Sequence, residues 1–437
     1  MFYTLSTIFF LTSQSFLILS ANINIFPEVF FLSYLVNRGF IPFVNYFDDH
    51  GFLLQLILSP FVYDKSLLPL KIIYLIIHAA SFYIFLLIIR KLTNSKFIFI
   101  LAGVSYLLTA FFLNENDFWF ETLILFFYLT IFYLTAFKNK INPLFIGLLI
   151  TLTSFVKITS TIILIPVLFL TKKFRIAIIF TVTWAAVFLF YFYKGGLSNL
   201  FNNLFSYNFY LSRYYRPTYL SDYKFLAFGG GVVLFSLLFT ALNKKLSKIL
   251  PVFTYWLSCF IFLASGYSKI RLLPLSVFSL IVIFQSMILI KPLSRKILIL
   301  LIIFYSFFMI FKVKNHRTYL NSQRIPYIEN KTSLEITKTL AAGKYDNFYI
   351  LSNNIQPYFL LNKLSVGYYP LKYPLINSFD KKYEDTIIQS LKNKNIQAVV
   401  IPKPIEEEFI DLKKIRNYLK QNYTLKFNYS SFQMLVK

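Results

Sequence analysis

The chain alternates long apolar runs with short clusters of lysine and arginine, and this alternation restricts its fold more than any other feature. Runs of membrane-spanning length occupy residues 3–21, 69–89, 97–113, 118–137, 175–193, 225–242, 249–266, 272–290 and 297–311. A further stretch, 143–171, is long enough for two short helices broken near Lys157. At 57% hydrophobic and 20% aromatic, the chain is far more apolar than a soluble domain. The pattern predicts a polytopic α-helical membrane protein with about eleven transmembrane helices.

The charges give this topology a direction. In a soluble chain a formal charge of +26 would indicate nucleic-acid binding, but here the basic clusters separate apolar runs, as cytoplasmic loops do. They begin at residues 90, 138, 172, 243 and 291. All eight acidic residues before position 312 lie in or beside the alternate, extracytoplasmic segments: Glu28, Asp48, Asp49, Asp64, Glu115, Asp117, Glu121 and Asp222. We therefore expect a multi-pass plasma-membrane protein that contacts the lipid bilayer and binds no nucleic acid.

Two segments near the N-terminus have alternative interpretations. The run 3–21 could be a signal peptide, although it lacks a basic beginning and a small-residue cleavage site. Residues 52–63 are apolar but too short to span, so we expect them along the outer membrane surface.

Composition changes near residue 312, where polar residues and the remaining ten of the 18 acidic residues appear. We therefore expect residues 1–311 to form the transmembrane domain and 312–437 a small C-terminal extracytoplasmic α/β domain. Segments 347–352 and 396–402 indicate buried strands, 382–394 and 405–421 have helical periodicity, and 425–436 suggests a terminal hairpin. The lone Cys259 excludes a disulfide framework.

The loop "NRGFIPFVNYFDDHGFLLQ", residues 37–55, places two adjacent acids and a histidine between apolar stretches. The simplest interpretation of Asp48 and Asp49 is a solvated pair. Close to a membrane interface, however, charges need a partner or a task, and neighbouring carboxylates raise one another's pKa. Asp48 and Asp49 are thus candidates for a general base or a cation site, and His50 for orienting a carboxylate.

This loop resembles the first outer loop of bacterial GT-C glycosyltransferases, the superfamily of protein O-mannosyltransferases and the lipid A aminoarabinose transferase. The residues that fit the pattern are Gly39, Pro42, Phe43, Phe47, Asp48, His50 and Gly51. Segment 145–170 resembles the family's Gly-rich helix with a lysine, here Lys157, and 195–215 resembles its outer loop after the seventh helix. Two positions depart from the pattern: Asn45 replaces an aspartate, and Phe52 follows Gly51 in place of proline.

The resemblance implies a GT-C fold that transfers a sugar, with inversion, from a polyprenyl-phosphate donor to a hydroxyl of a glycan, lipid or protein acceptor. It leaves the catalytic base open among Asp48, Asp49 and Glu28, and it favours Asp48, which alone of the adjacent pair fits the family pattern. Outer cations available to bind the donor phosphate are Lys157, Arg213, Arg216, Lys269 and Arg271. His50, Glu115 and Asp117 are expected near the acceptor. The sequence has no three-ligand metal motif, and a divalent cation, Mg²⁺ or Mn²⁺, held by acids and phosphate stays an open option.

Proteins with two other functions have hydropathy patterns similar to that of this chain. One is a transporter or flippase of lipid-linked saccharides, although such proteins commonly show internal repeats and charges at mid-membrane, and this chain shows no clear repeat. The other is a catalytically inactive GT-C paralogue, which the aspartate-to-asparagine change at Asn45 leaves open.

Overall fold

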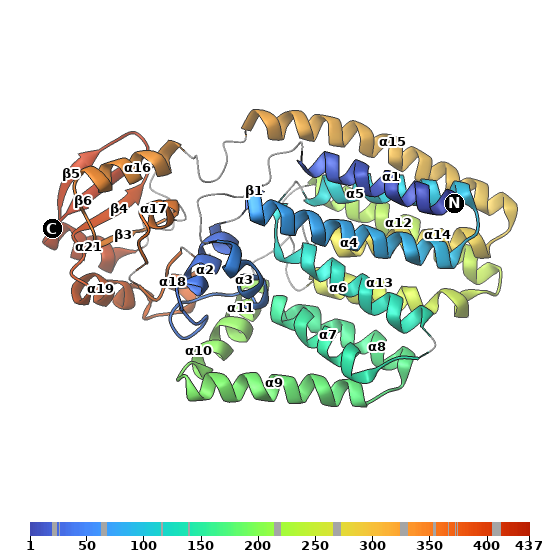
Figure 1. Ribbon diagram of the computed structural model, residues 1–437, viewed down its shortest axis with the longest axis horizontal. Helices are drawn as coiled ribbons and strands as arrows, with labels where there is room; N and C mark the ends of the chain where they lie inside the picture. Colours follow the sequence, from blue (N-terminus) through green and yellow to red (C-terminus); the bar gives the residue numbers. More distant parts are fainter. Residues whose placement is uncertain are drawn as a thin grey trace. The chain divides into compact units, whose positions relative to one another are not determined.

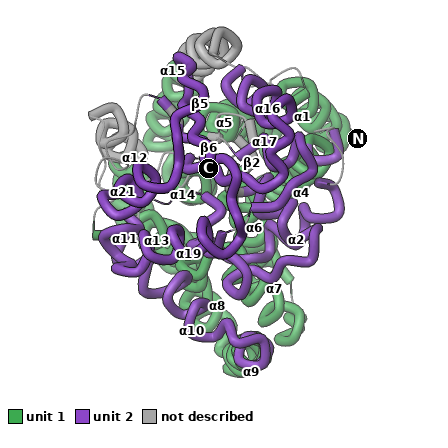
Figure 2. Tube along the Cα trace, turned by 90° about the vertical axis from the view of Figure 1, so that its left-hand side faces the viewer, with its two compact units in different colours: residues 1–24, 71–188, 212–324 green, residues 25–70, 189–211, 325–437 purple. Residues whose placement is uncertain are grey.

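A computed structural model (Figure 1) describes residues 1–19, 24–25, 27–62, 68–114, 117–138, 140–213, 220–264, 272–323, 331–352, 355–365, 367–371, 373, 375–403 and 412–437. The chain forms two compact units, coloured separately in Figure 2. Unit 1 comprises residues 1–24, 71–188 and 212–324. Unit 2 comprises residues 25–70, 189–211 and 325–437, so three separate chain segments build it.

Unit 1 is helical. It contains all or most of the residues of helices α1 (Phe2–Leu19), α4 (Leu68–Leu92), α5 (Lys96–Asn114), α6 (Phe120–Phe137), α7 (Pro143–Val156), α8 (Leu164–Thr171), α9 (Arg175–Tyr193), α12 (Leu220–Leu242), α13 (Leu246–Ala264), α14 (Leu272–Leu289) and α15 (Pro292–Gln323). Each apolar run expected to be a helix is one. The two-residue strands β1 (Asn24–Ile25) and β2 (Asp117–Phe118) pair with each other.

Seven helices within the described residues are long and apolar enough to cross a membrane: α1, α4, α5, α6, α9, α13 and α14. In the most hydrophobic window of α14, 78% of the residues are buried, and this helix packs against α5, α6, α12, α13 and α15. The corresponding share is only 17% in α1 and in α9, which expose apolar side chains such as Phe9 and Phe192. Apolar surface of that kind suits lipid contact, so the chain is a multi-pass helical membrane protein.

The expected break in segment 143–171 is confirmed. Helix α7 ends at Val156, Lys157 is extended with φ −157° and ψ 123°, and a 3₁₀ turn, η2 (Ile158–Ile163), leads into α8. Ser160 Oγ donates to the carbonyls of Thr153 at 2.8 Å and Lys157 at 2.6 Å, and Tyr128 donates to the Ser160 carbonyl at 2.8 Å. These bonds satisfy backbone groups that the break would otherwise leave unpaired in an apolar surrounding.

Unit 2 contains a mixed four-stranded sheet of order β3–β4–β6–β5. Its strands are β3 (Phe348–Ile350), β4 (Ala398–Pro402), β5 (Thr424–Asn428) and β6 (Phe432–Val436). β3 runs parallel to β4, whereas β6 is antiparallel to both β4 and β5, so the strands and the terminal hairpin expected here are confirmed. Side chains of β6 alternate between buried and half-buried positions, because successive residues of a strand point to opposite faces.

Short helices complete unit 2. They are α2 (Pro27–Asn37), α3 (Leu53–Leu58), the 3₁₀ turn η1 (Ser59–Phe61), α10 (Leu197–Phe201), the π-helical turn η3 (Asn202–Tyr207), α11 (Asn208–Ser212), α16 (Lys331–Ala342), α17 (Gln356–Leu360), α18 (Ile376–Phe379), α19 (Tyr383–Asn393) and α21 (Lys413–Asn422). α16, α19 and α21 bury apolar residues four apart, which share one helix face: Ile336 and Leu340, Ile387 and Leu391, Ile415 and Leu419. The segment 52–63 expected at the membrane surface forms α3 and η1, which pack against α2.

Candidate functional site

The loop 38–52 of unit 2 has an unusual backbone. Gly39 has φ 85° and Phe43 has φ 64°, a left-handed conformation that costs a bulky residue energy. The turn is held because the Phe43 N–H donates to the Tyr46 carbonyl at 3.0 Å and the Ile41 N–H donates to Asn45 Oδ1 at 2.7 Å. Asn45 therefore caps the turn that leads to the two acids.

Asp48, Asp49 and His50 converge around one imidazole nitrogen. His50 Nδ1 lies 3.1 Å from Asp49 Oδ1 and 3.4 Å from Asp48 Oδ1. The backbone N–H of His50 also donates to Asp48 Oδ1 at 3.2 Å. The Asp48 side chain is 0% exposed, whereas those of Asp49 and His50 are 14% and 12% exposed. The cluster thus combines one enclosed carboxylate with one that solvent can reach.

A chain of hydrogen bonds encloses Asp48 from the other side. Gln55 of α3 donates its amide to Asp48 Oδ2, and the hydroxyl of Tyr46 donates to Gln55 Oε1. All three side chains are fully or almost fully buried. Both carboxylate oxygens of Asp48 therefore have donors, as a buried charge requires.

Burial and charge shift the ionisation of this cluster in a consistent way. Burial raises the pKa of Asp48, and the hydrogen bond and charge of His50 offset only part of that rise. Burial alone would lower the pKa of His50, but the charge of Asp49 and the hydrogen bonds to Asp48 and Asp49 outweigh it and raise its pKa to about 9. The imidazole is therefore a cation near neutral pH.

The expectation that the sequence holds no three-ligand metal cluster was wrong, because Asp48, Asp49 and His50 offer ligand atoms that lie within 4.8 Å of one another. Carboxylate oxygens suit Mg²⁺ or Mn²⁺. The protonated Nδ1 of His50, however, already lies within hydrogen-bonding reach of both acids. These residues fit a divalent cation only if it competes with the proton of His50, so they would hold it more strongly at high pH.

Residues 199–208 of the same unit support the loop. Asn199 Nδ2 donates to the Phe43 carbonyl at 3.0 Å, and Asn208 Nδ2 donates to the Asp49 carbonyl at 2.6 Å. Asn208 follows the π-helical turn η3. π-helical turns of this kind frequently occur at functional sites.

In unit 1, the predicted phosphate ligand Lys157 already has a counter-ion. Its Nζ lies 3.1 Å from Glu121 Oε1, with the two side chains 5% and 0% exposed. Glu121 lies in the first turn of α6, and Lys157 occupies the break after α7. A buried ionisable pair at a broken helix commonly marks a functional site in membrane proteins.

The remaining predicted site residues are only partly described. Glu28 lies in the first turn of α2 and Asp117 in β2, without described side chains. Arg213 is exposed just after α11. Four residues lie outside the described residues: Glu115, Arg216, Lys269 and Arg271.

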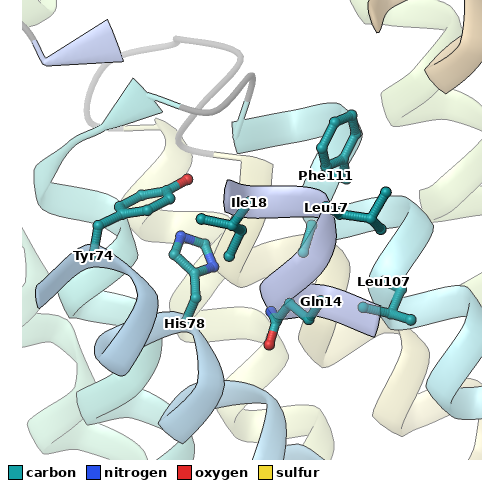
Figure 3. Close-up of a pocket in the computed structure, with 8 residues that line it drawn as sticks. Gln14, Leu17, Ile18, Tyr74, His78, Leu107 and Phe111 are labelled. Atoms are coloured by element: carbon teal, nitrogen blue, oxygen red, sulfur yellow. The ribbon is translucent and has the colours of Figure 1, made fainter. Parts of the chain in front are cut away.

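A small cavity lies between α1, α4 and α5 in unit 1 (Figure 3). His78 lies beside Tyr74 and opposite Gln14 and Ile18. The cavity volume is about 20 Å³, which is room for about one water molecule. Gln14 Oε1 is buried there with no hydrogen-bond partner among the described residues, so a water is the occupant that fits.

Sequence reasoning did not identify Gln55 or the pairing of Glu121 with Lys157. The signal for Gln55 was its place as the sole amide in the apolar stretch 52–63. Glu121 and Lys157 are 36 residues apart, and no sequence pattern indicates that they meet.

Comparison of the chain with protein-family models and with curated proteins finds no match. The resemblance to GT-C glycosyltransferases therefore rests on the sequence patterns given above.

We predict that His50 titrates near pH 9. Because this lies above the ordinary histidine value of about 6.5, protonated His50 stabilises the fold fully below pH 6.5, and that contribution is lost as pH rises through 9. The contribution is on the order of 3 kcal/mol. NMR titration of histidine-labelled protein measures the pKa, with His50→Gln as the assignment control. A value near 6.5 would contradict the described cluster.

We also predict that Lys157→Met lowers the free energy of unfolding by about 3–5 kcal/mol, because it leaves Glu121 buried without its counter-ion. The double variant Glu121→Gln with Lys157→Met should recover most of that loss. Thermal unfolding in lipid nanodiscs measures both. The matched control is Lys173→Met, since Lys173 Nζ donates to a neutral group, the Ile141 carbonyl, at 2.9 Å. Equal unfolding midpoints for Lys157→Met and Lys173→Met would exclude a stabilising ion pair.

Proposed function

We propose that the protein is an inverting membrane glycosyltransferase that uses a polyprenyl-phosphate sugar as donor. The observation that carries the proposal is the cluster of Asp48, Asp49 and His50, in which a solvent-accessible carboxylate is held beside an enclosed one. Sequence patterns similar to those of GT-C enzymes, in the same order along the chain, support the same assignment. A multi-pass membrane protein also suits a donor whose tail lies in the bilayer.

The side chains of Asp48 and Asp49 differ in exposure to solvent, so we assign them different roles. Asp49, at 14% exposed, is the carboxylate that an acceptor can reach, so we assign it the role of general base. It takes the acceptor hydroxyl proton as the oxygen bonds to the anomeric carbon and the bond from that carbon to the phosphate oxygen breaks. Asp48 is enclosed and instead orients His50, which in turn holds Asp49. Glu28 remains the alternative base.

The leaving polyprenyl phosphate needs a cation. Lys157 is the candidate with a described side chain in a membrane helix break, and we propose that the phosphate competes there with Glu121. Arg213, Arg216, Lys269 and Arg271 are further candidates. Glu115 and Asp117 stay candidates for contact with the acceptor, which is a glycan, a lipid or a protein.

The proposed topology has eleven crossings in the plasma membrane. It counts α12, α15 and the two short helices α7 and α8 in addition to the apolar helices described above. The positively charged loops are then cytoplasmic, and the loop 38–52 that carries Asp48 and Asp49, the carboxylate loop, is extracytoplasmic together with residues 312–437. The proposed donor would present its sugar on that side.

A second function is supported by one observation. Broken helices with buried ionisable residues are typical of transporters, and Lys157 and Glu121 form such a pair. A flippase of lipid-linked saccharides would move its substrate without breaking the glycosidic bond. Transfer assays therefore separate the two functions.

We predict that Asp49→Asn lowers sugar transfer by about 10²–10⁴-fold, because it removes the base. Asp48→Asn should lower transfer about tenfold, since it removes the charge that orients His50 but keeps the shape of the side chain. The assay follows radiolabel from polyprenyl-phosphate sugars into membrane acceptors. Asp346→Asn is the control, because the Asp346 side chain is 76% exposed in a surface ion pair.

Normal transfer by Asp49→Asn with loss in Asp48→Asn would return the base role to Asp48. Loss only in Glu28→Gln would assign it to Glu28. Absence of transfer by the wild type, with translocation of the intact donor, would favour the flippase.

We also predict that residues 331–437 are accessible from outside the cell. A protease added to intact cells should cleave a site inserted after Asn395, which lies in an exposed turn between α19 and β4. Cleavage is followed by blotting for a tag at residue 437. Protection in intact cells together with cleavage in lysed cells would contradict the proposed orientation.

A further inference from the structure

We infer that Tyr373 and the main chain of Tyr368 are positioning groups for the carboxylate loop, so that residues far along the chain complete the candidate site. The catalytic part of this inference rests on the proposed function. The structural part does not, because it concerns contacts within unit 2 alone.

Both main-chain polar groups of Phe47, its N–H and its carbonyl, form hydrogen bonds with residues of another segment. Its N–H donates to the Tyr368 carbonyl at 2.7 Å, and its carbonyl accepts from the Tyr373 hydroxyl at 2.6 Å. That carbonyl belongs to the peptide bond that joins Phe47 to Asp48. The hydroxyl of Tyr373 therefore fixes the plane of the peptide on which the enclosed carboxylate is mounted.

The side chain of Phe47 adds a second restraint. The ring is 2% exposed and packs among four tyrosines. Ring-centroid distances are 4.6 Å to Tyr373, 5.2 Å to Tyr207, 5.3 Å to Tyr369 and 6.3 Å to Tyr368. Aromatic packing of this kind restrains the ring and couples its position to those of Tyr368, Tyr369 and Tyr373.

Hydrogen bonds also restrain the loop after Asp48 in the sequence. Asn208 donates to the Asp49 carbonyl at 2.6 Å, and Asn203 donates to the Tyr368 hydroxyl at 3.3 Å. Asn203 and Asn208 thus connect the loop and Tyr368 through η3. Asp48 and Asp49 therefore lie between two restrained peptide groups. Tyr373 holds the Phe47 carbonyl before them, and Asn208 holds the Asp49 carbonyl after them.

Such restraint matters because a base must lie within hydrogen-bond reach of the proton it removes. A displacement of about 1 Å can lower a catalysed rate about 100-fold. Loss of one hydroxyl that fixes the Phe47–Asp48 peptide should therefore act on the rate more than on substrate binding.

The test compares Tyr373→Phe with Tyr423→Phe in full-length protein in nanodiscs. Both variants delete one buried tyrosine hydroxyl that donates to a backbone carbonyl, and Tyr423 bonds Ile396 at 3.0 Å beside the sheet. Hydrogen–deuterium exchange of residues 41–49 and the kinetics of sugar transfer are measured together.

For Tyr373→Phe we expect exchange of residues 41–49 to become about tenfold faster, with unchanged exchange in β4 and β6. We expect kcat to fall about tenfold while KM stays within about twofold. Tyr423→Phe should leave both the exchange of the loop and kcat unchanged.

Unchanged loop exchange in Tyr373→Phe, or equal effects of the two variants on the loop, would overturn the inference. Faster exchange throughout unit 2 would also overturn it, because the hydroxyl would then serve general stability. If the wild type transfers no sugar, the proposed enzymatic function fails, while the exchange measurement still decides whether Tyr373 positions the loop.

Discussion

The candidate site depends on the enclosure of Asp48. A carboxylate without exposed surface persists only if hydrogen-bond donors and an opposite charge replace water. Gln55 and His50 supply both, and Tyr46 supports Gln55 in turn. The turn that delivers Asp48 to these partners needs Phe43 in a left-handed conformation, so local strain and buried polar bonding are parts of one arrangement.

Unit 1 also buries a carboxylate, and there a lysine supplies the opposite charge. There Lys157 and Glu121 neutralise each other where a helix is interrupted, and Ser160 and Tyr128 satisfy the freed backbone. In both clusters, the buried charged side chain lies beside a side chain of opposite charge. The two clusters differ in accessibility, because the Asp49 side chain remains 14% exposed while Glu121 is fully buried.

Features that depend on residues close together in the sequence could be predicted from it, whereas contacts between distant residues could not. Helices over the apolar runs, the break at Lys157 and the strands at 348–350 and 398–402 arise from local hydrophobic patterns, and the structure has them. The cluster of Asp48, Asp49 and His50 could be identified as a candidate site in the sequence because charged residues are rare in apolar surroundings. The role of Tyr373 was not, since Phe47 is 326 residues away and no periodicity links them. The number of membrane crossings and their orientation remain predictions.

The construction of unit 2 from three distant segments has a consequence for how the protein reaches its native state. Contacts of long sequence separation form late, because the intervening chain must lose conformational freedom before they are rewarded. The loop with Asp48 leaves the ribosome before Tyr373 does, and the hydroxyl that orients it is more than 300 residues behind. During synthesis the strained turn at Phe43 therefore lacks part of its support, and the nascent protein has an unfinished site until residue 373 has emerged and packed. Assembly of the site is thereby coupled to synthesis of the segment that carries Tyr373.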